Sequence, residues 1–173
     1  MSVDPLRAYV EAALEGDDAA IGELVRLTQP AVWRVCGALG SPGEVEDLVQ
    51  ETYLRALTSL PRYRGEAPVR VWLLSIARRV CADHVRRRQR RRRLGERLAR
   101  HAVAAEVPSP QIVDDLLIGL DPDRREAFVL TQVAGLSYEE AAAVVGCPIG
   151  TIRSRVARAR ADLLDVVARA DAR

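Results

Sequence analysis

The stretch SYEEAAAVVGCPIGTIRSRVARAR, residues 137–160, decides the fold of the second half of this chain. Ser137 is followed three residues later by Glu140, a capping box that starts a helix. Gly146 then predicts a turn, and Pro148 suits the first position of a longer helix. A short helix, a glycine turn and a longer helix are typical of a helix-turn-helix, whose second helix enters the DNA major groove.

The longer of these two helices has one apolar and one basic side. Its apolar stripe comprises Ile149, Ile152, Val156, Ala159 and Leu163. Four arginines and no acid lie between Pro148 and Arg160, and Ser154 and Arg158 point most directly away from the stripe. Because the arginine fork can grip guanine or straddle a phosphate, we predict that this helix contacts DNA. The alternative is an ordinary solvated face of a bundle helix. No acid nearby is expected to pair the arginines, which favours DNA contact over this alternative.

Helix signals recur along the rest of the chain. Seven aromatic residues among many Ala, Leu, Val and Arg favour an all-α protein. The apolar spacing and the breakers predict helices over 5–15, 18–37 and 42–60, from 69 into an arginine run, and between Asp121 and Gly135. Ser41 is expected to cap the third of these, in a capping box with Glu44.

A linker separates two small helical domains. Residues 94–110 lose clear periodicity and end in Pro108-Ser109-Pro110. We therefore place one domain at 1–93, a flexible linker at 94–110, and the helix-turn-helix domain at 111–173.

Charge is distributed unevenly, and every basic residue is Arg. Residues 1–60 carry four Arg and ten acids, whereas residues 61–110 carry fourteen Arg and four acids. An acidic block followed by a basic block predicts two surfaces with different partners, one of them a polyanion. Residues 86–93 carry seven positive charges in eight positions, which suits phosphate, although a disordered solvated run is the alternative.

Other classes of function are poorly supported. No apolar run approaches 18 residues and the N-terminus lacks the pattern of a signal peptide, so we expect a cytoplasmic protein that does not enter a membrane. The three Cys are widely spaced and there are only two His, so we expect no disulfide framework, metal or cofactor. A nuclease would have only Asp83-His84 and Asp114-Asp115 as faint candidates, in different domains.

Two blocks of sequence resemble the extracytoplasmic function sigma factors, small bacterial initiation factors of the sigma-70 family. The first block runs from DLVQETYLRA (47–56) to WLLSIAR (72–78), and the second from LSYEEAA (136–142) to GTIRSRVARAR (150–160). The resemblance implies a non-enzymatic protein that binds core RNA polymerase and directs promoter-specific initiation. It further implies that the partners are the coiled coil of the largest polymerase subunit, the flap, promoter DNA and a separate anti-sigma factor.

The resemblance also implies the residues at each surface. The residues implied to bind polymerase are Asp47, Gln50, Glu51, Leu54 and Arg55. The residues implied to capture the melted minus-ten strand are Tyr63, Arg64, Gly65, Glu66, Ala67, Arg78, Arg79, Asp83, Arg86 and Arg87. The residues implied to read the minus-thirty-five duplex are Thr151, Arg153, Ser154, Arg155, Ala157 and Arg158. The spacing agrees with the first of these roles, because Asp47, Gln50 and Glu51 share one helical face and two are acidic, as suits a basic partner surface; an acidic solvated face is the alternative.

One position departs from the family pattern, and one other function stays open. Many relatives carry Asn where this chain has Arg79, and because Arg only donates hydrogen bonds, a minus-ten preference cannot be transferred. The alternative function is a one-component helix-turn-helix regulator that never binds polymerase. It would need a dimer interface to present paired half-sites, and we find no heptad seam for one.

Overall fold

The computed structural model describes residues 4–41, 43–98 and 116–171, and within these ranges every regular element is helical. The all-α prediction is therefore confirmed. In chain order the elements are α1 (Arg7–Leu14), α2 (Asp18–Leu39), α3 (Val45–Ser59), η1 (Leu60–Arg62), α4 (Val69–Leu98), α6 (Pro122–Phe128), η2 (Val129–Val133), α7 (Tyr138–Val145) and α8 (Ile149–Asp171).

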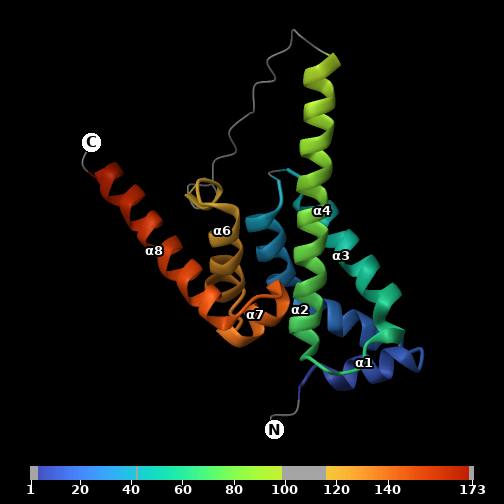
Figure 1. The fold of residues 1–173 in the computed structure, drawn as a ribbon. Helices are drawn as coiled ribbons and strands as arrows, with labels where there is room; N and C mark the ends of the chain where they lie inside the picture. Colours follow the sequence, from blue (N-terminus) through green and yellow to red (C-terminus); the bar gives the residue numbers. More distant parts are fainter. Residues whose placement is uncertain (1–3, 42, 99–115, 172–173) are drawn as a thin grey trace.

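The long helix α4 is the central rod of the molecule (Figure 1). Helix α3 lies on one side of it, α6, α7 and α8 lie on the other, and α1 lies near its first turn. The second half of α4 projects beyond the other helices. A basic rod therefore extends outward from a packed body.

One apolar core runs through both halves of the chain. It joins buried residues of α2 and α4, such as Val35 and Leu74, to Leu130 of η2 and Ile152 of α8. A second, smaller core lies under α1 and comprises Val10, Leu24, Leu60 and Val69. Because apolar burial is the main force that holds helices together, the two predicted domains pack as one unit in this structure.

Local capping decides where the helices of the second half begin and end. Asp121 caps α6, with Pro122 at its first position, and Ser137 and Glu140 form the predicted capping box at α7. Gly146 ends α7 in the left-handed conformation at φ 77°. That conformation is strained for residues with a Cβ, so glycine is needed to turn the chain into α8.

Replacing Ser137 by Ala is expected to lower the free energy of unfolding by about 1 kcal/mol, because the amide of Glu140 loses its acceptor. Urea denaturation followed by circular dichroism measures the change. Ser137→Asp keeps an acceptor at the same place and should retain wild-type stability. Equal stability of Ser137→Ala and wild type would show that the cap contributes nothing.

Two boundaries differ from the sequence prediction. The capping box expected at Ser41 is wrong: α3 begins at Val45, after Glu44, and neither residue's side chain caps it. Ser41 instead accepts a bond from the Glu44 amide through its backbone carbonyl, and Gly43 has a φ of 82°, so a turn precedes the helix. Helix α4 also continues to Leu98, five residues into the segment predicted as linker; the rest of that linker lies outside the described residues.

Candidate nucleic-acid interface

A cavity of about 420 Å³ lies where the loop before α4 meets the first turns of that helix. Its lining includes Tyr63, Arg64, Glu66, Ala67 and Arg79 from the predicted minus-ten set. The remaining lining residues are Arg62, Val71, Trp72, Ser75, Ala143 and Val144. Two aromatic rings and three arginines thus surround a space large enough for a small planar ligand.

The aromatic ring of Tyr63, in the loop, packs against that of Trp72 in the first turn of α4. The rings of Tyr63 and Trp72 are 5.0 Å apart between centroids and tilted by 45°. The Tyr63 hydroxyl donates to the carbonyl of Ala67 at 2.5 Å, which closes the loop on itself. Trp72 is partly buried against both apolar cores and also lines the cavity.

Arg78, from the same predicted set, points elsewhere. Its Nε lies 2.7 Å from Oε1 of Glu126 in α6, and its Nη2 lies 3.2 Å from Oε2 of the same carboxylate. The two side chains are only 23% and 17% exposed. This bidentate ion pair connects α4 to the second half of the chain. Ala143 and Val144 of α7 provide a second connection, because they line the cavity. No sequence pattern indicated that Glu126, Ala143 or Val144 would lie at this site.

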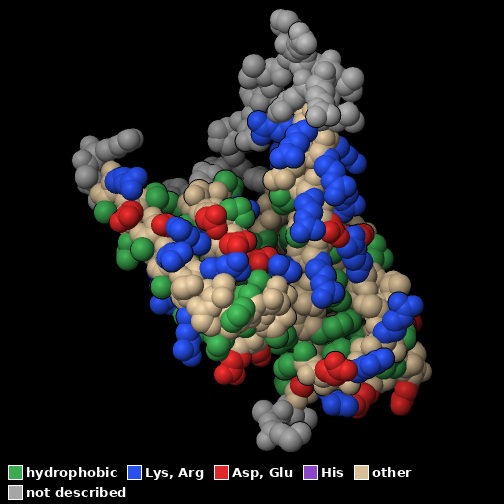
Figure 2. Space-filling view, in the orientation of Figure 1, with side chains coloured by type: hydrophobic (Ala, Val, Ile, Leu, Met, Phe, Trp, Pro, Cys, Tyr) green, Lys and Arg blue, Asp and Glu red, His purple; other side chains and the backbone are tan. Residues whose placement is uncertain are grey.

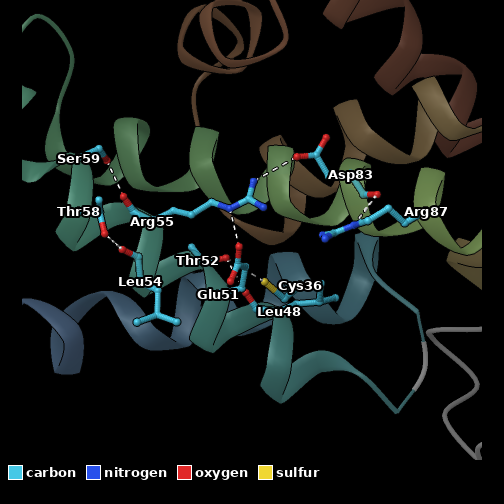
Figure 3. Close-up of polar contacts among 10 residues, drawn as sticks. All are labelled: Cys36, Leu48, Glu51, Thr52, Leu54, Arg55, Thr58, Ser59, Asp83 and Arg87. Atoms are coloured by element: carbon cyan, nitrogen blue, oxygen red, sulfur yellow. Dashed lines mark hydrogen bonds and ion pairs between the residues drawn. The ribbon is translucent and has the colours of Figure 1, made fainter.

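The predicted polymerase-binding residues divide into an exposed face and an ion-pair network. Asp47, Gln50 and Leu54 are exposed on α3, and Leu54 is 56% exposed although it is apolar. Arg55 instead lies between two carboxylates, with Glu51 at 2.7 Å and Asp83 of α4 at 3.1 Å (Figure 3). Both hydrogen bonds raise the pKa of Arg55, that from Glu51 more strongly. Arg55 therefore joins α3 to α4, while Leu54 points away from the network.

The basic side chains gather along the projecting part of α4 (Figure 2). Arg86 and Arg87 are exposed there, as are residues 88–93. The Nε of Arg87 donates to the backbone carbonyl of Asp83 at 3.3 Å. The whole run is helical, so the alternative of a disordered run is wrong.

The outer face of α8 presents most of the predicted duplex-reading residues. Arg153, Ser154, Ala157 and Arg158 are exposed on it, and Thr151 is half-buried. Arg155 behaves differently, because its guanidinium pairs with Asp123 in the first turn of α6. The expectation that no acid pairs these arginines is therefore wrong at Arg155, whose partner lies 32 residues earlier in the chain.

Of the residues considered for a nuclease, the two that the structure describes, Asp83 and His84, pair with different residues. Asp83 is held by Arg55, and Nε2 of His84 lies 2.5 Å from Oε2 of Glu44. Asp114 and Asp115 lie outside the described residues. Across 4–41, 43–98 and 116–171, no group of three or more His, Cys, Asp or Glu could hold a metal. None of the helices in these ranges is long and apolar enough to span a membrane.

A helical body with a base-sized cavity, a basic rod and a helix-turn-helix defines a DNA-binding protein of the sigma-70 class. The sigma-70 region 2 family matches residues 24–91, and the sigma-70 region 4 family matches residues 111–163. The chain belongs to the extracytoplasmic function (ECF) sigma factors of this family, and it is a sigma factor that directs transcription initiation.

Relatives and solved structures support this assignment along most of the chain. The ECF RNA polymerase sigma factor SigC of Mycobacterium tuberculosis is 42% identical over 167 residues, covering 93% of this chain and 90% of the relative. The solved structure of CnrH in complex with the cytosolic domain of CnrY has a TM-score of 0.73 at 31% identity, covering 93% of this chain and 96% of CnrH. The sigma factor RpoE bound to the anti-sigma factor NepR, from Bartonella quintana, has a TM-score of 0.74 at 32% identity, covering 85% of this chain and 96% of RpoE. These findings do not favour a one-component regulator.

Proposed function

We propose that three surfaces of the protein bind three different partners during initiation. The exposed face of α3 (Asp47, Gln50 and Leu54) binds the coiled coil of the largest polymerase subunit, with Glu51 and Arg55 behind it. The cavity at residues 62–67 takes an unstacked base of the minus-ten strand, and the outer face of α8 reads the minus-thirty-five duplex.

The cavity carries this proposal, because it combines the features that hold a single-stranded base. Aromatic faces gain on the order of 1–3 kcal/mol by stacking with a base, and nearby arginines neutralise the phosphates. Tyr63 and Trp72 supply the rings, and Arg62, Arg64 and Arg79 supply the charge. Capture of a base in this way replaces the stacking and pairing that the duplex loses.

The rest of the minus-ten set serves the strand in other ways. Asp83 positions Arg55, Gly65 shapes the loop at a φ of 73°, and Arg86 and Arg87 extend the basic path along α4. Arg78 reaches DNA only after its ion pair with Glu126 breaks. Binding of the strand is therefore expected to break this ion pair.

The chain acts as two functional regions, 1–93 and 111–173, with 94–110 between them. It performs no chemistry of its own and works in the cytoplasm, where its relatives' polymerase partners act. A separate anti-sigma factor covers the same surfaces, by analogy with the solved complexes of CnrH with CnrY and of RpoE with NepR.

Run-off transcription with purified core polymerase and genomic fragments tests the function directly. Addition of this protein should produce transcripts that start at defined sites. The variant Arg64→Ala with Arg79→Ala should lose these transcripts while it still binds core polymerase. Full transcription by that variant would exclude the cavity as the strand site.

The arginine run should contribute sequence-independent contacts to phosphate. In the variant Arg90→Gln with Arg91→Gln, the slope of log binding constant against log salt should become shallower by about 1 to 2, because each phosphate contact contributes about 0.9 on duplex DNA. Titrations of the holoenzyme on duplex promoter DNA at several salt concentrations measure the slope.

The matched control removes two exposed arginines of α2, in the variant Arg26→Gln with Arg34→Gln. It changes net charge equally and should leave the slope unchanged. Equal slopes for the two double variants would show that net charge alone, rather than contact by the run, sets the salt dependence.

A further inference from the structure

The carboxylate of Asp4 joins the N-terminal segment to the first turn of α4. Its Oδ2 accepts a hydrogen bond from the amide of Val69 at 2.6 Å, and its Oδ1 accepts one from the amide of Leu6 at 3.0 Å. The residue before Val69 is Pro68, whose side chain has no acceptor to offer. Asp4 therefore supplies from 65 positions away the capping acceptor that a helix normally receives from its own N-cap residue.

Helix α1 packs under the aromatic pair that lines the cavity. Val10 is buried against Leu60 and Val69, and the half-buried rings of Tyr63 and Trp72 pack on this small core. The loop that carries Tyr63 thus rests on an apolar support that the N-terminal segment builds.

Charges of the same segment flank the loop. The guanidinium of Arg7 lies 3.3 to 3.6 Å from the position that a Cβ on Gly65 would occupy, close above the middle of the loop. Burial raises the pKa of the Tyr63 phenol, the charge of Asp4 raises it further, and Arg7 opposes both. The phenol therefore stays protonated and can donate to Ala67.

We propose that the segment Asp4–Leu14 is a positioning element of the strand-capture loop, with Asp4 as its key positioning residue. The segment lies before residue 24, where the match to region 2 begins. The inference rests on the proposed role of the cavity in holding a minus-ten base. A loop that is fixed before it binds loses less conformational entropy on binding, so the carboxylate of Asp4 strengthens strand capture without touching DNA.

The test measures strand binding and duplex binding separately on the same holoenzyme. One probe is a fluorescent single-stranded oligonucleotide with the non-template minus-ten sequence of a promoter mapped by run-off transcription. The other is a duplex that carries only the minus-thirty-five region of that promoter. Asp4→Ala should weaken binding of the single strand about fivefold, as expected for one lost helix cap, and leave duplex binding unchanged.

Two further variants separate positioning from general loss of stability. Asp4→Asn keeps one acceptor oxygen, enough for the amide of Val69 but not also for that of Leu6, so it should restore part of the single-strand affinity; it also serves if Asp4→Ala folds poorly. Asp17→Ala removes the same kind of cap from α2, where the carboxylate accepts from Ala19 at 2.9 Å and Ala20 at 3.2 Å. It should leave both affinities unchanged.

The outcomes distinguish the two proposals. If Arg64→Ala with Arg79→Ala loses the single strand but Asp4→Ala does not, the positioning role is wrong and the cavity proposal stands. If the arginine variant keeps full affinity for the single strand, the cavity proposal itself is wrong. A loss with Asp17→Ala as large as that with Asp4→Ala would also overturn the positioning role.

Discussion

Replacing Asp47 by Arg should weaken binding of core RNA polymerase at least about 30-fold if the interface buries Asp47 against a basic partner group, because truncating one partner of such a buried charge pair costs about 2–5 kcal/mol. Asp47 is exposed on α3 beside Gln50, and the exposed apolar side chain of Leu54 lies two turns further along. An apolar centre with an acidic edge suits a partner surface that is apolar and basic. Titration of labelled protein with purified core enzyme measures the affinity.

Asp47 is a cleaner position for this test than Glu51. The Glu51 carboxylate lies 2.7 Å from Arg55, which also bonds Asp83 in α4. Reversal of Glu51 would break this network and could move α4, so a loss of binding would have two explanations. Within the part of the chain that the structure describes, Asp47 forms no ion pair that would complicate its substitution.

Asp18→Arg is the matched control for Asp47→Arg. Asp18 is an exposed acid in the first turn of α2, as Asp47 is in the first turn of α3. Both reversals lose the same favourable interaction with a helix N-terminus, so they should destabilise the fold similarly. Equal polymerase affinities for the two variants would refute the assignment of the α3 face.

Local signals in the sequence predicted the helices of the second half well. The cap of α7 joins residues three apart, and that of α6 joins Asp121 to amides two and three residues later. Such contacts depend on a few neighbouring residues, so a sequence pattern can identify them. The same reasoning failed at Ser41, because the positive φ of Gly43 places a turn where the pattern indicated a first helical turn.

Contacts between distant segments could not be predicted in this way. Arg78 and Glu126 are 48 positions apart, and Arg155 and Asp123 are 32 apart. No helical period connects such residues. Arg78 was assigned to DNA through the family resemblance, and Arg155 through the basic pattern of its helix and the same resemblance, so neither assignment took the acidic partner into account. The packing of α7 against the cavity likewise depends on how two separate modules fit together. Charge and periodicity identify the basic surfaces, but tertiary packing decides which arginines already have a partner.

Replacing Arg158 by Ala should weaken binding to the minus-thirty-five duplex by about 1–3 kcal/mol, or about 5- to 150-fold, if its fork grips a base edge. Arg158 is exposed on the outer face of α8, and so are Arg153 and Ser154. The loss should be concentrated at one base pair of the site. Binding of the holoenzyme to duplexes with each single base-pair change measures both the size and the position of the effect.

Arg155→Ala is the comparison variant for Arg158→Ala. The guanidinium of Arg155 is already held by Asp123, so its removal should reduce stability more than it reduces base discrimination. Arg158→Ala should show the opposite balance, with unchanged stability and relaxed selectivity at one position. If Arg158→Ala weakens binding uniformly across all sequences and only makes the salt dependence shallower, Arg158 contacts phosphate rather than a base.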